Sequence, residues 1–128
     1  PLGAQHTNAA QVGALKGKIR EINGVNVIAE IVTAGKTDDL RNMAFSLKKD
    51  VENLYAVLGA KIGGKAALCI IISDNLVAEK GLNAGQIIRE ISREIKGGGG
   101  GQSFFATAGG KEPGGLKMAL EKGIEVFG

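Results

Sequence analysis

Seven consecutive apolar residues, AALCIII at positions 66–72, place the tightest limit on the fold of this chain. A strand with no polar side chain has no face suited to water, so we expect it to lie inside a sheet covered on both sides. Gly63 and Gly64 precede it, and another extended run, 55–62, lies just upstream. Two extended runs joined by two glycines predict a β-hairpin. A buried hairpin is therefore the centre of the predicted fold.

The segments around the hairpin predict the rest of the sheet and its covering layers. Residues 25–33 and 104–108 have the composition of strands. Apolar residues recur at helical spacing over about 37–51, 83–96 and 113–127. The predicted class is therefore α/β (mixed α+β): a central mixed β-sheet of about four to five strands packed with helices, preceded by the end of a longer helix.

That longer helix is predicted from residues 8–22. Val12, Leu15, Ile19 and Ile22 alternate in steps of three and four, which is the seam of a coiled coil. We expect residues 1–22 to hold a tag remnant (Pro-Leu-Gly) and the end of a helical segment of the dimerisation type. Residues 23–128 would form the globular domain. The alternative is an N-terminal helix that packs on its own domain.

A glycine-rich stretch, KGGGGGQSFFATAGGK at residues 96–111, is the strongest candidate for a binding site. Glycine accepts positive φ, so a loop of glycines can turn several backbone N–H groups toward one anion. Lys96 and Lys111 flank the stretch, and Arg89 and Arg93 form a basic stripe with Lys96 on the preceding helix. Two alternatives stay open: a flexible linker, and close packing of two backbones that excludes side chains.

Composition sets looser limits. The formal net charge is +3 and the pI is about 9.1, which permits a nucleic-acid partner without requiring one. The single cysteine, Cys69, predicts a small core residue in a reducing compartment. The longest apolar run is too short to cross a bilayer, and no secretory signal opens the chain. We expect a cytoplasmic protein with no membrane partner.

Catalytic patterns fail on inspection. His6 is the only histidine, so neither a histidine-based triad nor a histidine-rich metal site can be built. Residues 59–65, GAKIGGK, match the start of a P-loop, but Ala66 stands where a hydroxyl should reach magnesium, and a strand follows instead of a helix. We therefore predict no catalytic residue, no metal site and no cofactor in this fragment, and interpret the chain as a binder.

The motifs resemble one known family. From about residue 8 to the end, the chain resembles the C-terminal, DHHA1-type domain of alanyl-tRNA synthetase, which is also appended to DHH phosphoesterases. The most specific part is IKGGGGGQ at 95–102 followed by ATAGGK at 106–111, with Pro113 and a final amphipathic helix. Related phosphoesterases end the glycine run in a histidine that contacts substrate phosphate. Here Gln102 follows the run, which favours the synthetase branch.

The resemblance implies a noncatalytic module that grips the elbow of tRNA, with alanine tRNA as the expected partner, and couples aminoacylation with editing. The parent enzyme would use ATP and Mg, with Zn in its editing domain, and would form a homodimer through the N-terminal helical segment. The alternatives are the substrate-binding domain of a DHH-family phosphoesterase and the C-terminal domain of a free-standing alanyl-tRNA editing protein. The family motif assigns tRNA or phosphate contact to Gly97, Gly98, Gly99, Gly100, Gly101, Gln102, Gly109, Gly110 and Lys111, and helix periodicity adds Arg89, Arg93 and Lys96.

Overall fold

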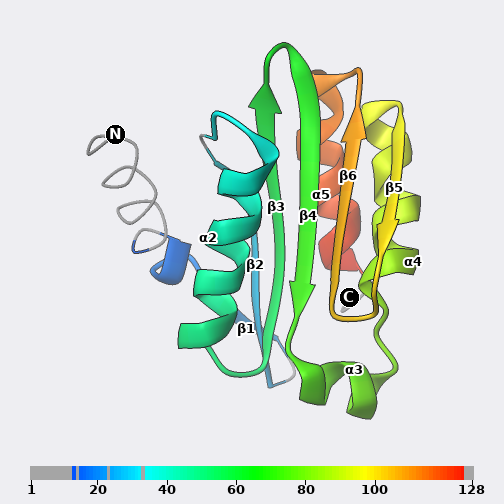
Figure 1. The fold of residues 1–128 in the computed structure, drawn as a ribbon. Coiled ribbons are helices and arrows are strands. Elements are labelled where there is room, and N and C mark those ends of the chain that lie inside the picture. The colour runs from blue at the N-terminus through cyan, green and yellow to red at the C-terminus, as the bar shows by residue number, and fades with distance from the viewer. Residues whose placement is uncertain (1–12, 14, 23, 33, 126–128) are drawn as a thin grey trace.

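A six-stranded mixed sheet forms the middle layer of the molecule (Figure 1). The computed structural model describes residues 13, 15–22, 24–32 and 34–125. The strands stand in the order β1-β2-β3-β4-β6-β5; β2 and β3 run parallel, and all other neighbours run antiparallel. Their bounds are β1 Arg20–Ile22, β2 Val25–Ile31, β3 Leu54–Ile62, β4 Lys65–Ile72, β5 Gly97–Gly101 and β6 Phe105–Gly110.

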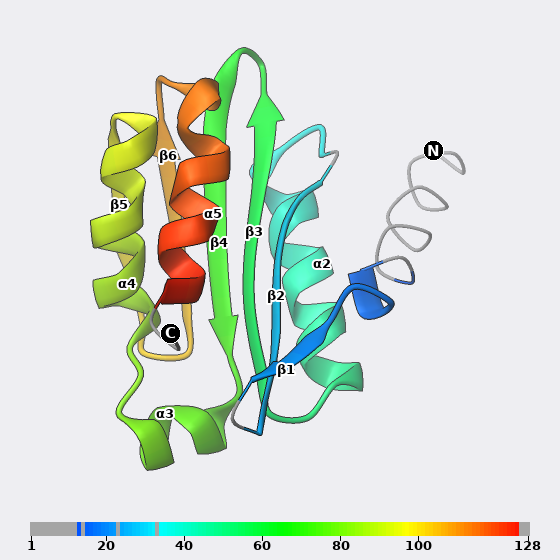
Figure 2. The ribbon, with the colours of Figure 1, turned by 180° about the vertical axis from the view of Figure 1, so that it is seen from behind.

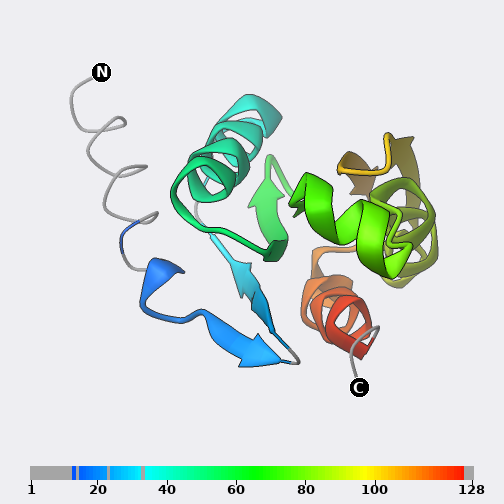
Figure 3. The same ribbon diagram turned by 90° about the horizontal axis from the view of Figure 1, so that it is seen from below.

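Helices cover the two faces of the sheet unequally. The helix α2 (Thr37–Asp50) lies on one face, while α4 (Ala84–Ile91) and α5 (Leu116–Ile124) lie on the other (Figures 2 and 3). The short α3 (Asp74–Lys80) lies below the sheet in Figure 1. Two 3₁₀ turns, Ser92–Ile95 and Pro113–Gly115, lead into β5 and α5. Because α2 stands over β2 to β4, the same face of β5 and β6 has no helix in front of it (Figure 1).

Each face of the sheet has its own apolar core. Leu40, Met43 and Leu47 of α2 are fully buried against one face, as their spacing predicts. Ile88 of α4 and Ala119 of α5 are fully buried on the other face. The strands β3 and β4 contribute alternate side chains to both cores, which is the arrangement that a continuous apolar run requires.

The predicted hairpin and fold class are confirmed. Gly63 and Gly64 connect β3 to β4, and both have positive φ. The strand β4 lies between β3 and β6, and Cys69 on it is fully buried. The class is mixed α/β as predicted, although the sheet has six strands instead of four to five.

Three local predictions are wrong. The helix expected over residues 8–22 does not reach Ile22, because Arg20–Ile22 is a strand that pairs with β2; residues 1–12 and 14 lie outside the described part. The helix expected to reach Lys96 ends as an α-helix at Ile91 and tightens into a 3₁₀ turn. The glycines 97–101 form a strand, not a loop.

Candidate functional site

The five consecutive glycines form β5, the strand at one edge of the sheet. None of them has positive φ, so the expectation of a glycine loop with left-handed turns is wrong. The turn occurs one residue earlier, where Lys96 adopts φ 54° and ψ 48°. An extended strand cannot turn all its amides toward one point, because successive N–H groups alternate between its two sides. A cradle converging on a single phosphate is therefore not what these glycines build.

Close packing explains why alternate positions of β5 must be glycine. A Cβ on Gly97 or Gly99 would overlap the backbone of β6, and one on Gly101 would lie 2.5 Å from the Phe105 carbonyl oxygen. By contrast, a Cβ on Gly98 would meet nothing within 4 Å. On the other side, Gly85 of α4 approaches so closely that its own Cβ would lie 3.0 Å from the Gly101 oxygen. The close-packing interpretation is correct for part of the stretch.

The outer edge of β5 nevertheless presents backbone groups to solvent. The Gln102 N–H donates to the Phe105 carbonyl (2.8 Å), which makes that opposed pair a hydrogen-bonded one. Alternation along an antiparallel ladder then turns the N–H and C=O groups of Gly97, Gly99 and Gly101 away from β6. These three residues are exposed. Their amides stand about 7 Å apart, twice the rise per strand residue.

Three lysines meet at one end of this edge because of the strand register. Ala66 pairs with Gly110, and Gly110 pairs with Gly97, so these residues form one row across β4, β6 and β5. Lys65, Lys111 and Lys96 each lie one residue beyond that row. Since neighbouring strands lie about 5 Å apart, the three lysine backbones span only about 10 Å.

These lysines line a hollow of about 390 Å³ whose floor is Ala66 and the glycines 97, 109 and 110. We name it the lysine hollow. Among the described residues, none of the three lysines has an ion-pair partner. The nearest acid in sequence, Glu112, instead accepts a hydrogen bond from the Gly114 N–H (3.1 Å). The lysine hollow therefore concentrates positive charge that the described protein does not neutralise.

A second hollow, which we name the face hollow, continues from the first along the uncovered sheet face. It measures about 550 Å³ and shares Lys65, Ala66 and Gly109 with the lysine hollow. Its walls are small or apolar, and Thr37 and Thr107 supply its hydroxyl groups. The remaining lining residues are Ile62, Ala67, Gly98, Gly99, Gly100 and Ala108.

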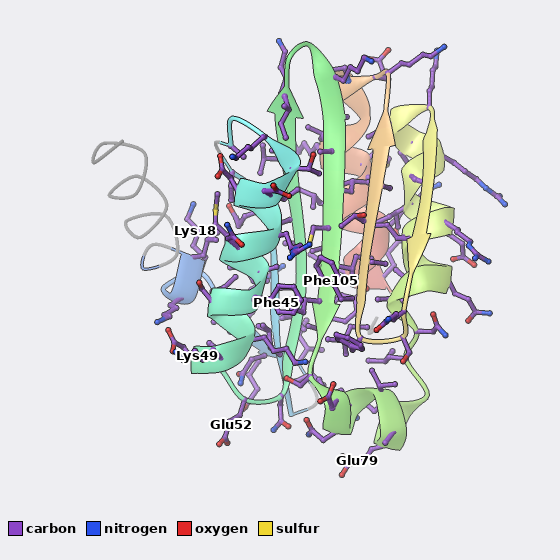
Figure 4. All side chains as sticks on the ribbon, in the orientation of Figure 1. Lys18, Phe45, Lys49, Glu52, Glu79 and Phe105 are labelled. Atoms are coloured by element: carbon purple, nitrogen blue, oxygen red, sulfur yellow. The ribbon has the colours of Figure 1, made fainter. Side chains whose placement is uncertain are left out.

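An aromatic contact lies on the same side of the sheet as the face hollow. The Phe45 ring of α2 meets the Phe105 ring of β6 with centroids 4.8 Å apart (Figure 4). The Lys48 ammonium lies 4.7 Å from the centroid of the Phe104 ring. Phe45 is 38% exposed although it is a large apolar residue.

The structure separates the predicted site residues into distinct places. Lys96, Lys111, Gly109 and Gly110 meet at the lysine hollow. Arg89 of α4 lies beside the middle of β5, since a Cβ on Gly100 would be 3.7 Å from its Nε. The predicted residues Arg93 and Gln102 lie elsewhere.

The basic stripe of Arg89, Arg93 and Lys96 is broken. Arg93 lines a different hollow, together with Glu90, Lys122 and Glu125, and the chain turns left-handed at Lys96 after a 3₁₀ turn. Gln102 follows β5 at the end opposite Lys96, about 20 Å away along the strand. The predicted residues therefore do not form one cluster.

Lys65 is the residue that sequence reasoning missed. It belongs to the segment GAKIGGK, which was set aside because it fails as a P-loop. The structure confirms that this segment is not a P-loop, because Lys65 begins β4 and not a helix. This lysine reaches Lys111 only because β4 pairs with β6, a strand that does not follow β4 directly in the sequence. Its position next to the hairpin turn predicts that Lys65 lies at an end of the sheet, but does not predict that it lies beside the glycines.

Other polar and thiol groups in the described part of the chain serve the fold. Within the described residues, no cluster of three or more His, Cys, Asp or Glu side chains is placed to hold a metal ion. Burial raises the pKa of the Cys69 thiol to about 12, so it is protonated at neutral pH. The buried Tyr55 hydroxyl donates to the Gly123 carbonyl (2.8 Å).

No helix in the described part of the chain is long and apolar enough to cross a membrane.

Comparison with known proteins connects this geometry to one family. The DHHA1 domain family matches residues 24–128. Two relatives with the name alanine–tRNA ligase are 49% identical over 114 residues (Cytophaga hutchinsonii) and 45% identical over 121 residues (Bacteroides fragilis). They align with 89% and 94% of this chain, which spans only 13% and 14% of their own lengths.

A solved structure shows the same fold. The C-Ala domain from Aquifex aeolicus alanyl-tRNA synthetase superposes with a TM-score of 0.75 at 24% sequence identity. The superposition covers 85% of this chain and 96% of that domain. At this identity the likeness concerns the arrangement of strands and helices.

Proposed function

The chain belongs to the DHHA1 domain family, and on that premise we propose that it is the tRNA-binding C-terminal domain of an alanine–tRNA ligase. The observation that carries the proposal is the exposed edge of β5 beside Lys96 and Lys111. Neither lysine has an acidic partner among the described residues. Unpaired cations and free backbone groups suit a polyanion whose sequence is not read.

The extended form of β5 suits a nucleic-acid strand better than a single phosphate. Its outward N–H groups, spaced along a line at Gly97, Gly99 and Gly101, can each donate to a different phosphate oxygen. The carbonyls of Gly97 and Gly99 face the same way and can accept from ribose 2′-hydroxyls, which distinguish RNA from DNA. Recognition would thus depend on the shape and backbone of a folded RNA.

Within the parent enzyme, the module would hold the tRNA elbow while the acceptor end moves between aminoacylation and editing sites. The relatives are ligases, and position 102 is glutamine where related phosphoesterases carry histidine. Both observations favour this function over a phosphoesterase substrate-binding domain. The homodimer, the cytoplasmic location and the choice of alanine tRNA stay predictions.

The test is a titration of this domain, by fluorescence anisotropy, with whole tRNA and with an acceptor-stem minihelix of the same tRNA. We expect the whole tRNA to bind with a dissociation constant of about 1 μM or weaker, because the charge of the domain is modest. We expect the minihelix, which lacks the elbow, to bind at least several-fold more weakly. Equal affinities would refute the elbow as the contact, and no binding of either would refute tRNA binding by this domain.

A further inference from the structure

We propose that the lysine hollow and the face hollow together bind one unstacked nucleotide of RNA. Its phosphate would lie among Lys65, Lys96 and Lys111, and its base would lie on the bare face of β5 and β6. The inference rests on the proposed function and deepens it. It adds Lys65 as a contact residue and states the form of RNA that the surface accepts.

The charge of the lysine hollow argues for a phosphate. Three lysines from the ends of three adjacent strands line one hollow, and their like charges repel one another unless an anion lies between them. The floor beneath them is Ala66 with Gly97, Gly109 and Gly110, so no bulky floor side chain keeps an anion from the backbone. Glu112 and Glu94 are held elsewhere, by the Gly114 N–H and by Lys122 respectively.

The continuity of the two hollows argues for a nucleotide instead of a free anion. A group leaving the lysine hollow past Lys65 and Gly109 enters the face hollow directly, because both residues line both spaces. There it meets glycines and alanines together with Ile62, Thr37 and Thr107. Apart from Lys65, the lining carries no charged residue. A planar, largely apolar base fits such a surface, and a second phosphate does not.

This geometry requires a base with one face free. Inside a duplex each base is covered above and below by its neighbours, so it cannot lie on a protein surface without leaving the stack. Single strands, bulges and loops supply free faces at little cost. The surface should therefore prefer an unpaired nucleotide to a regular double helix.

The test uses anisotropy titrations of three probes with this chain: whole tRNA, a single-stranded RNA 12-mer without self-complementarity, and a blunt duplex containing that 12-mer. The variant Lys65→Ala removes a cation from both hollows. Its matched control is Lys61→Ala, which removes the same charge from the same hairpin at an exposed position lining neither hollow. Titrations are repeated across a range of salt concentrations.

We expect Lys65→Ala to weaken single-strand and tRNA binding about three- to tenfold at 0.1 M salt and to reduce the salt slope of log affinity by about 0.7 to 0.9. Lys61→Ala should change neither quantity appreciably. The duplex should bind more weakly than the single strand. Equal effects of the two lysine variants, or equal affinities of duplex and single strand, would overturn the inference.

A steric variant tests the shared part of the two hollows. A Cβ on Gly109 would have the Ala66 oxygen, at 3.9 Å, as its nearest neighbour, so Gly109→Val adds bulk without a backbone collision. We expect weaker binding with an unchanged salt slope, because no charge is lost. If Gly109→Val lowers the melting temperature substantially, the smaller Gly109→Ala replaces it.

These outcomes separate the inference from the proposed function. Undiminished binding by a folded Gly109 variant overturns the inference, while the proposed function survives if wild-type protein still prefers whole tRNA to the minihelix. A wild-type domain that binds no RNA overturns both.

Discussion

Adjacent glycines of β5 should respond in opposite ways to the same substitution. Gly98→Ala places a methyl group where nothing lies within 4 Å. Gly99→Ala places it 2.5 Å from the Ala108 Cα and from the Ala108 Cβ, and closer still to the Thr107 oxygen. Optimal carbon–carbon contact is about 3.5 to 4.0 Å, so the overlap is at least about 1 Å. Two main chains must separate to relieve it.

The magnitudes follow from that geometry. Overpacking a rigid site costs about 1 to 3 kcal/mol, and we take the upper end because the atoms met are backbone. Replacing glycine with alanine also stiffens the unfolded chain, which stabilises the protein by about 0.4 to 1 kcal/mol where the native conformation allows a side chain. Gly98→Ala should therefore leave stability unchanged or raised by up to about 1 kcal/mol, and Gly99→Ala should lower it by about 2 to 3 kcal/mol.

Urea unfolding followed by far-ultraviolet circular dichroism measures both variants. With an m-value of about 2 kcal/mol per molar, Gly99→Ala should lower the midpoint by about 1 to 1.5 M and Gly98→Ala should not lower it. Gly101→Ala serves as a second member of the sensitive class, since its Cβ would lie 2.6 Å from the Ala106 Cα. Equal midpoints for the 98 and 99 variants would refute the alternation, and with it the outward direction of the Gly97, Gly99 and Gly101 amides.

Two further predictions concern charge and pH. Arg89→Ala should weaken tRNA binding and reduce its salt slope by about 0.7 to 0.9, while Arg93→Ala should change neither. The reason is that Arg89 lies beside Gly100, whereas Arg93 lines a separate hollow with Glu90, Lys122 and Glu125. Equal losses for the two variants in a salt titration would contradict this. Burial raises the pKa of Cys69 to about 12 and raises that of Tyr55 as well, so the unfolded state releases these protons first as the pH rises above about 9. The free energy of unfolding, measured in urea, should fall above that pH by up to about 1.4 kcal/mol per pH unit for each group. Cys69→Ala should make this fall less steep. A free energy of unfolding that stays constant from pH 9 to 11 would refute the prediction.

Local sequence patterns predicted the interior of this fold well. The run 66–72 became β4, which pairs with β3 through the predicted hairpin and is buried as expected. Asn83 and Gln86 have the spacing of a helix-capping pair, and the Gln86 N–H donates to the Asn83 side chain (3.1 Å). Glycine is the usual residue after a helix, and Gly81 follows α3 in the left-handed conformation that glycine adopts readily. These features depend on residues within a few positions of one another.

The binding surface was harder to predict because it depends on register between strands distant in sequence. Lys65 reaches Lys111 only through the pairing of β4 with β6. Lys96 left the predicted basic stripe because the 3₁₀ turn Ser92–Ile95 altered the helical phase and Lys96 itself adopts a left-handed conformation. Helical periodicity assumes 3.6 residues per turn throughout, and a 3₁₀ turn has three. Neither the register nor the change of helix type has a clear signature in a single sequence.

The glycine run shows why packing and binding were not true alternatives. The absence of side chains lets β6 approach Gly97, Gly99 and Gly101 on one side of β5, and lets Gly85 of α4 approach Gly101. That same absence leaves the outward amides of Gly97 and Gly99 uncovered at the edge of the sheet. An unprotected edge invites pairing with another strand. The neighbouring lysines favour an anionic partner over another β-strand, because a strand added there would bring its own backbone to three unneutralised charges. A ligand with regularly spaced negative charge meets both requirements, and RNA has that property.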